Sequence, residues 1–485
     1  MDDNQIDSFV ETYVQALHDQ NAAVFAGAGL SIPAGFVNWK DLLRNIAKEI
    51  GLDVDKEDDL VSVAQFHVNE RAGGRHKINQ ALIHEFAVRS KSTENHDLLA
   101  SVPIRTFWTT NYDSLIEDSL KAHGKTPDVK STVPNLATTV PRRDAVVYKM
   151  HGDAAHPDEA VVTKDDYESY ETRRHVFSTA LQGHLVSKTF LFIGFSFNDP
   201  NLNYILGRIR FLLGENRREH YCLLRRVQRK DFKKAKDYQY ARAKQELQVK
   251  DLRRYGIIGL LVDSYAEATH VLRRIFYRYK LARVFMSGSA AEYKPWSEQK
   301  AHQFIQMLSA ALIRAGFGIV SGFGLGVGPY VLNGLLQELE KQGTRVLDDR
   351  VVLRPFPIAI ADPDERKLRW TSYREDMLTQ AGVALFVFGN KRNSAGGISP
   401  ADGMEEEFRI AVQKELFVVP VGCTGGMAAT LHQRVLDNFG EYYRLPGYRK
   451  LFEPLGLPGT PAQVTLRTLS LVKKLWGDRA LAREK

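Results

Sequence analysis

Cysteine is scarce in this chain, which has only Cys222 and Cys423 among its 485 residues. Two cysteines argue against a disulfide framework, and they exclude a cluster of four cysteines around structural zinc. Uninterrupted apolar stretches are short, and none approaches the roughly 20 residues that cross a bilayer. The opening residues, Met1-Asp-Asp-Asn-Gln5, lack the basic start of a secretory signal. We therefore expect a cytoplasmic protein with no metal site and no membrane contact.

No Gly/Ser-rich linker marks a domain boundary. The chain is nevertheless longer than the size at which one hydrophobic core usually stops growing, so two domains are expected. Strand-like apolar runs alternate with helical periodicity, and the pattern restarts after a helical stretch at residues 266–279. We predict two α/β domains, residues 1–280 and 281–485, each with an open, mainly parallel sheet of the Rossmann type.

The predicted strands are short apolar runs bounded by turn residues or by helical patterns. They lie at residues 22–26, 104–108, 146–150 and 190–193 in the first half, and at 283–286, 318–320, 351–353, 383–388 and 416–421 in the second.

Lysine and arginine are dense between Leu224 and Arg254, with acidic residues interspersed at helical spacing. This pattern is typical of a solvated helical face. A surface that follows phosphates or contacts another subunit remains the alternative. The net charge of +8 permits binding to nucleic acid, but charge alone does not indicate it, and we do not expect nucleic acid as a partner.

Five polar or glycine-rich segments occur in the first half, and at least four directly follow a predicted strand. They are Ala26-Gly-Ala-Gly-Leu-Ser31, Thr109-Thr-Asn-Tyr-Asp113, Met150-His-Gly152, Gly194-Phe-Ser196 and Asp199-Pro-Asn201. In open α/β sheets, ligands bind beyond the carboxyl ends of the strands, so these segments converge on one crevice. The arrangement predicts a nucleotide pocket, and NAD is the ligand that we expect.

Each segment also has a structural interpretation. Gly27 and Gly29 suit close approach to a pyrophosphate, but a plain strand-to-helix turn also uses glycine. Asn111 and Asp113 are suited to an Asx turn or a helix cap. His151 alone is more often a structural group than a base. The ordered combination of all the segments favours the nucleotide pocket.

These motifs resemble those of the sirtuin-like NAD-consuming domains over roughly the first 280 residues. The resemblance implies that Asn111 contacts the nicotinamide ribose, that Asp113 lies near the carboxamide, and that His151 is the base acting on a ribose hydroxyl or on water. Such a base suits a reaction that expels neutral nicotinamide and leaves positive charge on the sugar. The implied dinucleotide-binding residues are Gly27, Ala28, Gly29, Ser31, Asp113, Gly194, Ser196 and Asp199.

The chain departs from the sirtuin deacylases in two places. Their zinc module needs four cysteines, which this chain does not have. The segment Ile32-Pro-Ala-Gly-Phe-Val-Asn-Trp39 also differs from their Pro-Asp-Phe-Arg pattern. We therefore expect water to be the acceptor and the protein to be an NAD+ hydrolase that uses NAD+ as substrate. An NAD-dependent protein deacylase is the alternative.

The second half offers two amide-rich turns suited to phosphate, Ser287-Gly-Ser289 and the glycine-rich segment at residues 321–328. This half resembles the SLOG nucleotide-sensing domains, which are related to lysine-decarboxylase-like phosphoribohydrolases. Those enzymes carry a PGGxGTxxE motif, whereas this chain has a degraded form between Ser394 and Glu405. This difference favours a domain that senses a nucleotide over one that hydrolyses it.

The two halves together resemble the effectors of the bacterial Thoeris antiphage system. That resemblance implies activation by a cyclic ADP-ribose isomer, made by a partner TIR-domain protein, and assembly into homotetramers or filaments. The implied signal-binding residues are Gly288, Ser289, Gly324, Arg374, Lys391 and Glu406. A non-catalytic module that binds nucleotides or nucleic acid remains a further alternative.

Overall fold

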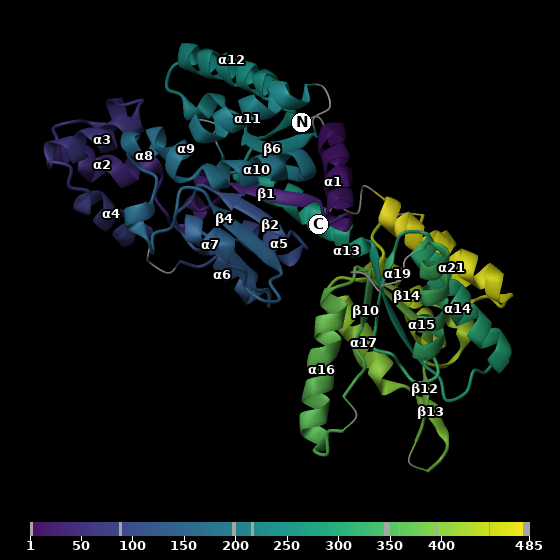
Figure 1. The fold of residues 1–485 in the computed structure, drawn as a ribbon. Coiled ribbons are helices and arrows are strands. Elements are labelled where there is room, and N and C mark those ends of the chain that lie inside the picture. Colours follow the sequence, from purple (N-terminus) through teal and green to yellow (C-terminus); the bar gives the residue numbers. More distant parts are fainter. Residues whose placement is uncertain are drawn as a thin grey trace. The chain divides into compact units, whose positions relative to one another are not determined.

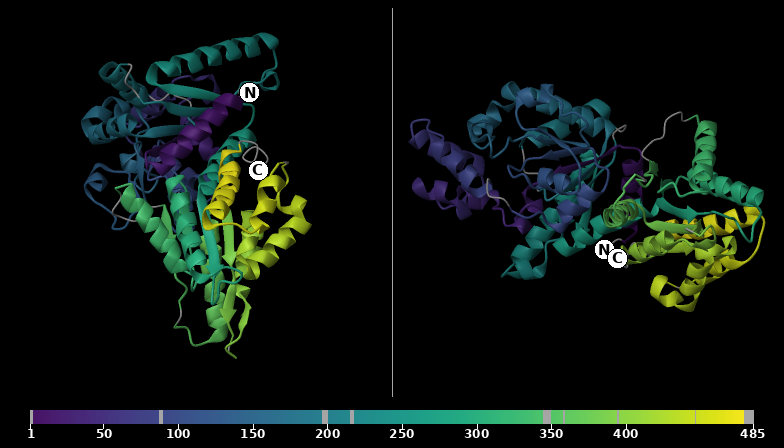
Figure 2. Two further views of the ribbon diagram at one scale, coloured as in Figure 1. Left: turned by 90° about the vertical axis from the view of Figure 1, so that its right-hand side faces the viewer. Right: turned by 90° about the horizontal axis from the view of Figure 1, so that it is seen from below.

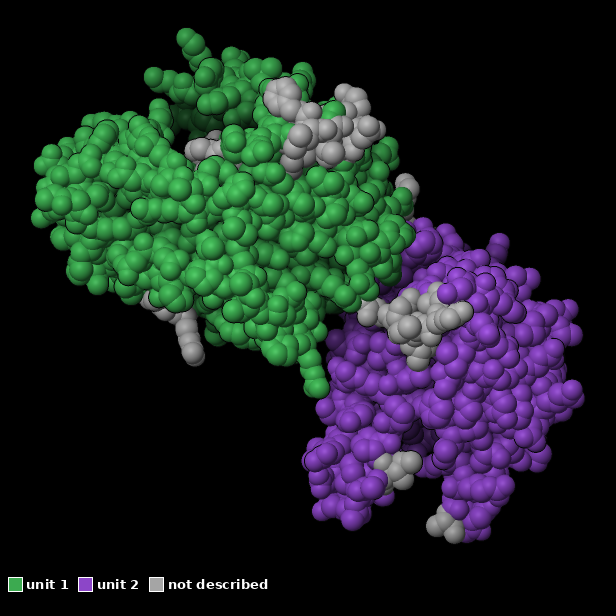
Figure 3. Space-filling model, in the orientation of Figure 1, with its two compact units in different colours: residues 1–276 green, residues 277–485 purple. Residues whose placement is uncertain are grey.

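The computed structural model describes residues 3–86, 90–195, 200–214, 218–343, 350–357, 359–393, 395–445 and 447–478. The chain divides into two compact units, Met1–Phe276 and Tyr277–Lys485, coloured separately in Figure 3. The predicted boundary at residue 280 falls inside α13 (Tyr265–Leu281), a few residues beyond this division.

Unit 1 contains a seven-stranded parallel sheet in the order β3-β4-β2-β1-β5-β6-β7 (Figure 1). Its strands are β1 (Ala22–Ala26), β2 (Thr106–Thr109), β3 (Pro127–Lys130), β4 (Ala145–Lys149), β5 (Thr189–Ile193), β6 (His220–Arg225) and β7 (Ile257–Val262). β1 and β5 are buried along their whole length, as expected for central strands covered on both faces. The strands β3, β6 and β7 were not predicted.

The helices of unit 1 fall into a set that accompanies the sheet and a small group inserted between β1 and β2. The inserted group consists of α2 (Trp39–Glu49), α3 (Leu60–Glu70) and α4 (His76–Phe86), and it has its own apolar core around Leu43 and Val63. The others are α1 (Asp3–His18), α5 (Glu94–Ser101), α6 (Leu115–Ala122), α7 (Val133–Ala137), α8 (Lys164–Glu168), α9 (Tyr170–Arg173), α10 (His175–Ser187), α11 (Pro200–Leu213), α12 (Ala235–Leu252) and α13.

Most of the basic stretch forms α12. Among the residues of this helix, Leu252 alone is buried, which agrees with a solvated helical face. The start of the stretch was interpreted incorrectly, because Leu224 and Arg225 are the last residues of β6. The first residues of β6 are buried, and the strand ends where the basic stretch begins.

Unit 2 contains a five-stranded parallel sheet in the order β10-β9-β8-β11-β14, with helices on both faces (Figure 2). Its strands are β8 (Arg283–Ser289), β9 (Gly318–Ser321), β10 (Val351–Leu353), β11 (Val383–Phe388) and β14 (Phe417–Pro420), and β12 (Asn390–Arg392) pairs with β13 (Ile398–Pro400) in a separate hairpin. The helices are α14 (Glu298–Arg314), α15 (Gly328–Lys341), α16 (Pro363–Thr379), α17 (Asp402–Gln413), α18 (Gly426–Asp437), α19 (Phe439–Tyr442), α20 (Arg449–Phe452) and α21 (Pro461–Gly477).

The predicted fold class, two open parallel α/β sheets, is confirmed. Each sheet reverses its strand order beside its first strand, at β1 in unit 1 and at β8 in unit 2. Such switch points are where ligands bind in open α/β sheets. Within the described ranges, no helix combines the length and apolar character needed to span a membrane.

Candidate functional site

A cavity of about 760 Å³ lies beyond the carboxyl ends of the strands in unit 1. Its size is within the range of small-molecule and cofactor sites. Of the predicted residues, Ala28, Gly29, Ser31, Asn111, Asp113, His151 and Gly194 line this one cavity. Gly27 is not among the described lining residues. Ser196 and Asp199 lie outside the described residues.

Gly27, Gly29 and Gly194 serve the packing of two loops against each other. A Cβ atom on Gly27 would lie 2.4 Å from the carbonyl oxygen of Gly194, and one on Gly194 would lie 2.3 Å from the nitrogen of Leu30. Gly194 also has a φ of 66°, which disfavours other residues. Loop packing alone therefore requires these glycines. For Gly27, the structural interpretation accounts for the residue in full.

The side chain of Asn111 is held in one orientation. Its Nδ2 donates to the carbonyl oxygen of Gly27 (3.1 Å) and to Oγ of Ser31 (3.0 Å). The carbonyl acceptor fixes which terminal atom is nitrogen. The remaining atom, Oδ1, is buried and has no hydrogen-bond partner among the described residues. It is an unused acceptor on a residue that lines the cavity, and its chemistry suits a hydroxyl of a bound ligand.

Asp113 has the helix-capping role considered from the sequence. Its Oδ1 accepts a hydrogen bond from the backbone nitrogen of Leu115 (3.1 Å), at the first residue of α6. Its Oδ2 is buried and, within the described part of the chain, accepts no hydrogen bond. One oxygen thus caps the helix, while the other is an unused acceptor beside the cavity that Asp113 lines.

His151 lies in the turn after β4, and a hydrogen bond from a later segment holds its backbone. Its carbonyl oxygen accepts from the backbone nitrogen of Val161 (2.9 Å). The rings of Tyr167 and Tyr170 lie 5.5 and 6.4 Å from the imidazole, both edge-on. Gly152 follows with a φ of 89°, a left-handed backbone conformation that favours glycine. These contacts hold a buried imidazole in the cavity wall.

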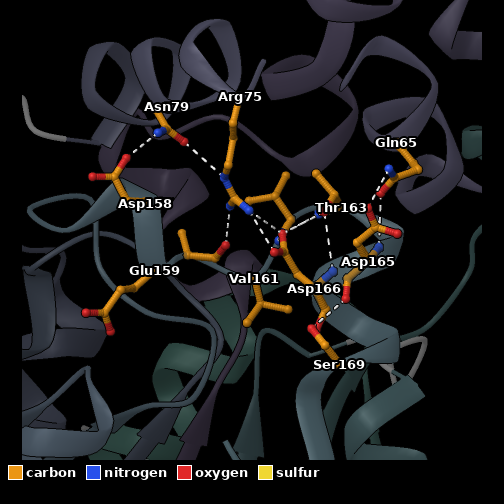
Figure 4. Close-up of polar contacts among 12 residues, drawn as sticks. Gln65, Arg75, Asn79, Asp158, Glu159, Val161, Thr163, Asp165, Asp166 and Ser169 are labelled. Atoms are coloured by element: carbon orange, nitrogen blue, oxygen red, sulfur yellow. Dashed lines mark hydrogen bonds and ion pairs between the residues drawn. The ribbon is translucent and has the colours of Figure 1, made fainter. Parts of the chain in front are cut away.

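The segment after His151 is tied to the inserted helical group (Figure 4). Arg75 Nη1 lies 2.7 and 2.8 Å from the two carboxylate oxygens of Asp166, and Arg75 also donates to the carbonyl of Ala160. Burial raises the pKa of Asp166, but hydrogen bonds from Thr163 and the charge of Arg75 outweigh it and hold that pKa below its usual value. Ninety-one positions separate Arg75 from Asp166, so sequence spacing gave no sign of this ion pair.

A second wall of the cavity was missed from the sequence. It consists of Leu223, Leu224, Arg225, Val262, Tyr265 and Ala268. Arg225 lies 6.0 Å from the ring of Tyr265 and pairs with Asp231 at 2.7 Å. The apolar runs at residues 220–224 and 257–262 were the available signal, because each is long enough for a buried strand.

In unit 2, the predicted phosphate turns pack against each other. Gly288 and Ser289 end β8, and a Cβ atom on Gly324 would lie 2.0 Å from the carbonyl oxygen of Gly288. Ala290 donates to the carbonyl of Leu325 (2.8 Å) just beyond. The two turns therefore form one continuous backbone surface at the switch point of this sheet.

The predicted charged residues of unit 2 are already paired. Arg374 is buried beside the rings of Phe356 (5.1 Å) and Trp370 (5.9 Å), and its Nη1 lies 2.7 Å from Oε2 of Glu406. Glu407 lies 3.6 Å from Arg374. The structure thus brings Arg374 and Glu406 together.

Glu407 links this pair to β8, since it accepts from Oγ of Ser287 (2.5 Å). Burial raises the pKa of Glu407 despite Ser287 and Arg374. Lys391 instead pairs with Asp402 at 2.5 Å, on the hairpin side. Figure 3 shows a hollow between the two projections of unit 2 that α16 and the β12–β13 hairpin form.

No cluster of three or more His, Cys, Asp or Glu side chains in the described ranges could hold a metal ion. The cavity of unit 1 is lined by an amide, a carboxylate and an imidazole, from Asn111, Asp113 and His151.

Two family models match the chain. Residues 105–249 match the SIR2-like domain, and residues 267–473 match the Sir2- and TIR-associating SLOG family. The fold and both candidate sites accordingly define a protein with a SIR2-like domain followed by a SLOG-type domain. The predicted resemblance of each half is confirmed.

Curated relatives align with nearly the whole chain. The NAD(+) hydrolase ThsA of Bacillus cereus (strain MSX-D12) is 47% identical over 468 residues, covering 96% of this chain and 97% of the relative. The NAD(+) hydrolase ThsA of Acinetobacter baumannii (strain 532279) is 47% identical over 453 residues (92% and 94%). The NAD(+) hydrolase ThsA of Enterococcus faecium is 42% identical over 479 residues (97% and 99%). This chain belongs to the ThsA family.

Proposed function

We propose that this chain is an NAD+ hydrolase whose reaction takes place in the cavity of unit 1 and acts on the NAD+ of the cytoplasm. The observation that carries the proposal is that Asn111 and Asp113, which follow β2, and His151, which follows β4, line one cavity. If Asn111 and His151 had lined separate cavities, they could not have acted on the same ribose. The relatives named NAD(+) hydrolase support the same activity.

The reaction breaks the bond between C1′ of the ribose and N1 of nicotinamide. The electron pair of that bond leaves with nicotinamide, which becomes neutral, and positive charge develops on the sugar. Water adds to C1′ and loses a proton to His151, giving ADP-ribose. Asn111 Oδ1 accepts from a ribose hydroxyl, and Asp113 Oδ2 accepts from the carboxamide. Fixed dipoles of this kind lower the barrier because they need no reorganisation as charge forms.

Water rather than an acylated lysine is the acceptor in this proposal. The zinc module of the deacylases needs four cysteines, and this chain has two. Cys222 is buried within β6, and Cys423 belongs to unit 2. A strict requirement for an acylated peptide in the assay below would instead favour the deacylase.

We further propose that unit 2 gates the hydrolase by binding a cyclic ADP-ribose isomer from a partner TIR-domain protein, within a homotetramer or filament. Gly288, Ser289 and Gly324 offer backbone amides for phosphate, while Arg374, Lys391 and Glu406 supply charges for a pyrophosphate and a ribose hydroxyl. Gating requires the isomer to bind the active arrangement more tightly than the resting one. A ligand with equal affinity for both arrangements does not change their populations.

The test uses the purified full-length chain with NAD+, alone and with a panel of cyclic ADP-ribose isomers, followed by chromatography of the products. We expect nicotinamide and ADP-ribose to appear with one isomer and not without it. Product formation that no isomer alters would overturn the gating. Absence of nicotinamide release under every condition, combined with salt-dependent DNA binding, would overturn the hydrolase and favour a nucleic-acid-binding module.

A further inference from the structure

Lys149, the last residue of β4, is completely buried beneath the cavity without lining it. Its ammonium nitrogen lies 2.5 Å from the carbonyl oxygen of Asp113 and 3.3 Å from that of Tyr112. It also lies 2.5 Å from Oδ2 of Asp153 and 3.2 Å from Oε1 of Glu117. Lysine is almost never fully buried unless it is paired, so this position needs an explanation.

The groups around Lys149 come from three separate places in unit 1. Tyr112 and Asp113 belong to the turn after β2, Glu117 belongs to α6, and Asp153 lies two residues after His151. Burial lowers the pKa of Lys149, but Glu117 and Asp153 outweigh it and hold that pKa above its usual value. Lys149 therefore carries its charge, and its three N–H donors are shared among two carbonyls and two carboxylates.

We propose that Lys149 is a positioning residue for NAD+ hydrolysis, holding the turn of Asn111 in fixed register with the turn of His151. The proposal rests on the hydrolase function given above. Asn111 directly precedes the first bonded carbonyl, and His151 lies between Lys149 and Asp153 along the chain. One ammonium thus connects the backbones that carry the amide and the imidazole. A small displacement of either group would misplace it relative to the ribose.

In a purely structural role, Lys149 would only neutralise two buried carboxylates. That role and the positioning role predict different outcomes for a variant in which the ammonium and both carboxylate charges are removed together. Lys149→Met alone leaves buried charges unpaired and is expected to destabilise unit 1. The triple variant Lys149→Met, Glu117→Gln, Asp153→Asn removes the ammonium together with both carboxylate charges. It leaves no unpaired charge in this cluster, yet the carbonyls of Tyr112 and Asp113 still lack their donor.

The closing experiment compares the wild-type chain with the triple variant, using NAD+ and the activating isomer. We expect the triple variant to fold, its kcat to fall about 100-fold, and its dissociation constant for ADP-ribose to change by no more than about threefold, because orientation is lost while the binding groups remain. Amide hydrogen exchange at residues 111–113 and 151–153 should become faster. A merely structural role predicts a wild-type kcat once no charge in the cluster is unpaired.

Lys130 provides a matched control in the same sheet. It is buried at the last position of β3, pairs with Asp128 at 2.7 Å and donates to the carbonyl of Thr138 (2.5 Å), away from the cavity. Lys130→Met leaves Asp128 with Arg143 (2.6 Å), so it should lower stability without changing kcat or the exchange of the two turns. A folded triple variant with wild-type kcat, or an equal loss in Lys130→Met, overturns the inference. A wild-type chain that releases no nicotinamide overturns the proposed function itself.

Discussion

The two candidate sites are built in opposite ways. In unit 1, the groups that face the cavity keep unused acceptors, Asn111 Oδ1 and Asp113 Oδ2, since no described residue donates to them. In unit 2, Arg374 is paired with Glu406, and Lys391 with Asp402. The first site is arranged before any ligand arrives. In the second, Arg374 and Lys391 already have carboxylate partners within unit 2.

This difference has an energetic meaning. A ligand that donates to Asn111 Oδ1 or Asp113 Oδ2 displaces no donor of the described residues, whereas an anionic ligand at Arg374 must compete with Glu406. Breaking a buried ion pair is costly unless the new partner replaces it in full. A site that exchanges internal ion pairs for a ligand has two discrete arrangements, which is what a switch requires.

The contrast between the two sites is tested most directly by removing the side chains of His151 and Asn111, which line the cavity of unit 1. We expect His151→Ala to lower kcat by about 10²–10⁴-fold, the range of a lost general base, and Asn111→Ala to abolish nicotinamide release as well. Both variants should melt within a few degrees of wild type, because neither change unpairs a buried charge. The measurement is nicotinamide release with the activating isomer, and turnover retained in both variants refutes the assigned roles.

The rigidity of unit 1 is tested at Gly194. Gly194→Ala should destabilise unit 1 by about 2–4 kcal/mol, because the new methyl group meets backbone and the positive φ is strained. Gly183→Ala is the matched control, since this glycine is exposed within α10 with open space around it, and should stabilise by about 0.5–1 kcal/mol. Urea denaturation measures both, and equal midpoints would contradict the packing role of Gly194.

The paired charges of unit 2 are tested at Arg374. Arg374→Ala should weaken binding of the activating isomer by about 10–100-fold, the worth of a hydrogen bond to a charged group, and so block activation. NAD+ binding should be unchanged because the cavity of unit 1 does not involve this residue. Calorimetry with each ligand separates the two effects. Unchanged affinity for the isomer would count against the assignment.

The smallest expected effect concerns pH and Glu407. A carboxyl whose pKa is raised in the folded state stabilises the fold fully below its unfolded pKa, and this contribution is lost as pH rises through the folded value. Glu407→Gln mimics the protonated form. Its Tm relative to wild type should therefore increase by a few degrees between pH 5 and pH 8. A relative decrease over that interval would show that the ionised form is favoured.

Local patterns predicted the sheet centres and the residues beside them. The runs at 22–26 and 190–193 are apolar throughout because both faces of β1 and β5 are covered, and Asn111, Asp113 and His151 follow strands directly. β3 was missed because Pro127–Lys130 carries two charged residues, Asp128 and Lys130, whose burial depends on pairing with each other and with Arg143. β7 was also missed, and it follows the basic stretch closely in the sequence.

The supporting contacts could not be predicted because they join distant positions. Lys149 reaches the Asp113 carbonyl across 36 positions, and Arg75 reaches Asp166 across 91. No local pattern distinguishes these side chains from solvated ones. Likewise, Arg374 and Glu406 were both identified, but their ion pair depends on how α16 packs against α17.

The cavity wall draws on residues from Ala28 to Ala268, nearly the whole length of unit 1. During synthesis, a growing chain lacks the second wall until β7 and the start of α13 have emerged from the ribosome. Nascent fragments therefore present an incomplete cavity. Under the proposed NAD+ hydrolysis, chains that end before β7 are expected to release no nicotinamide.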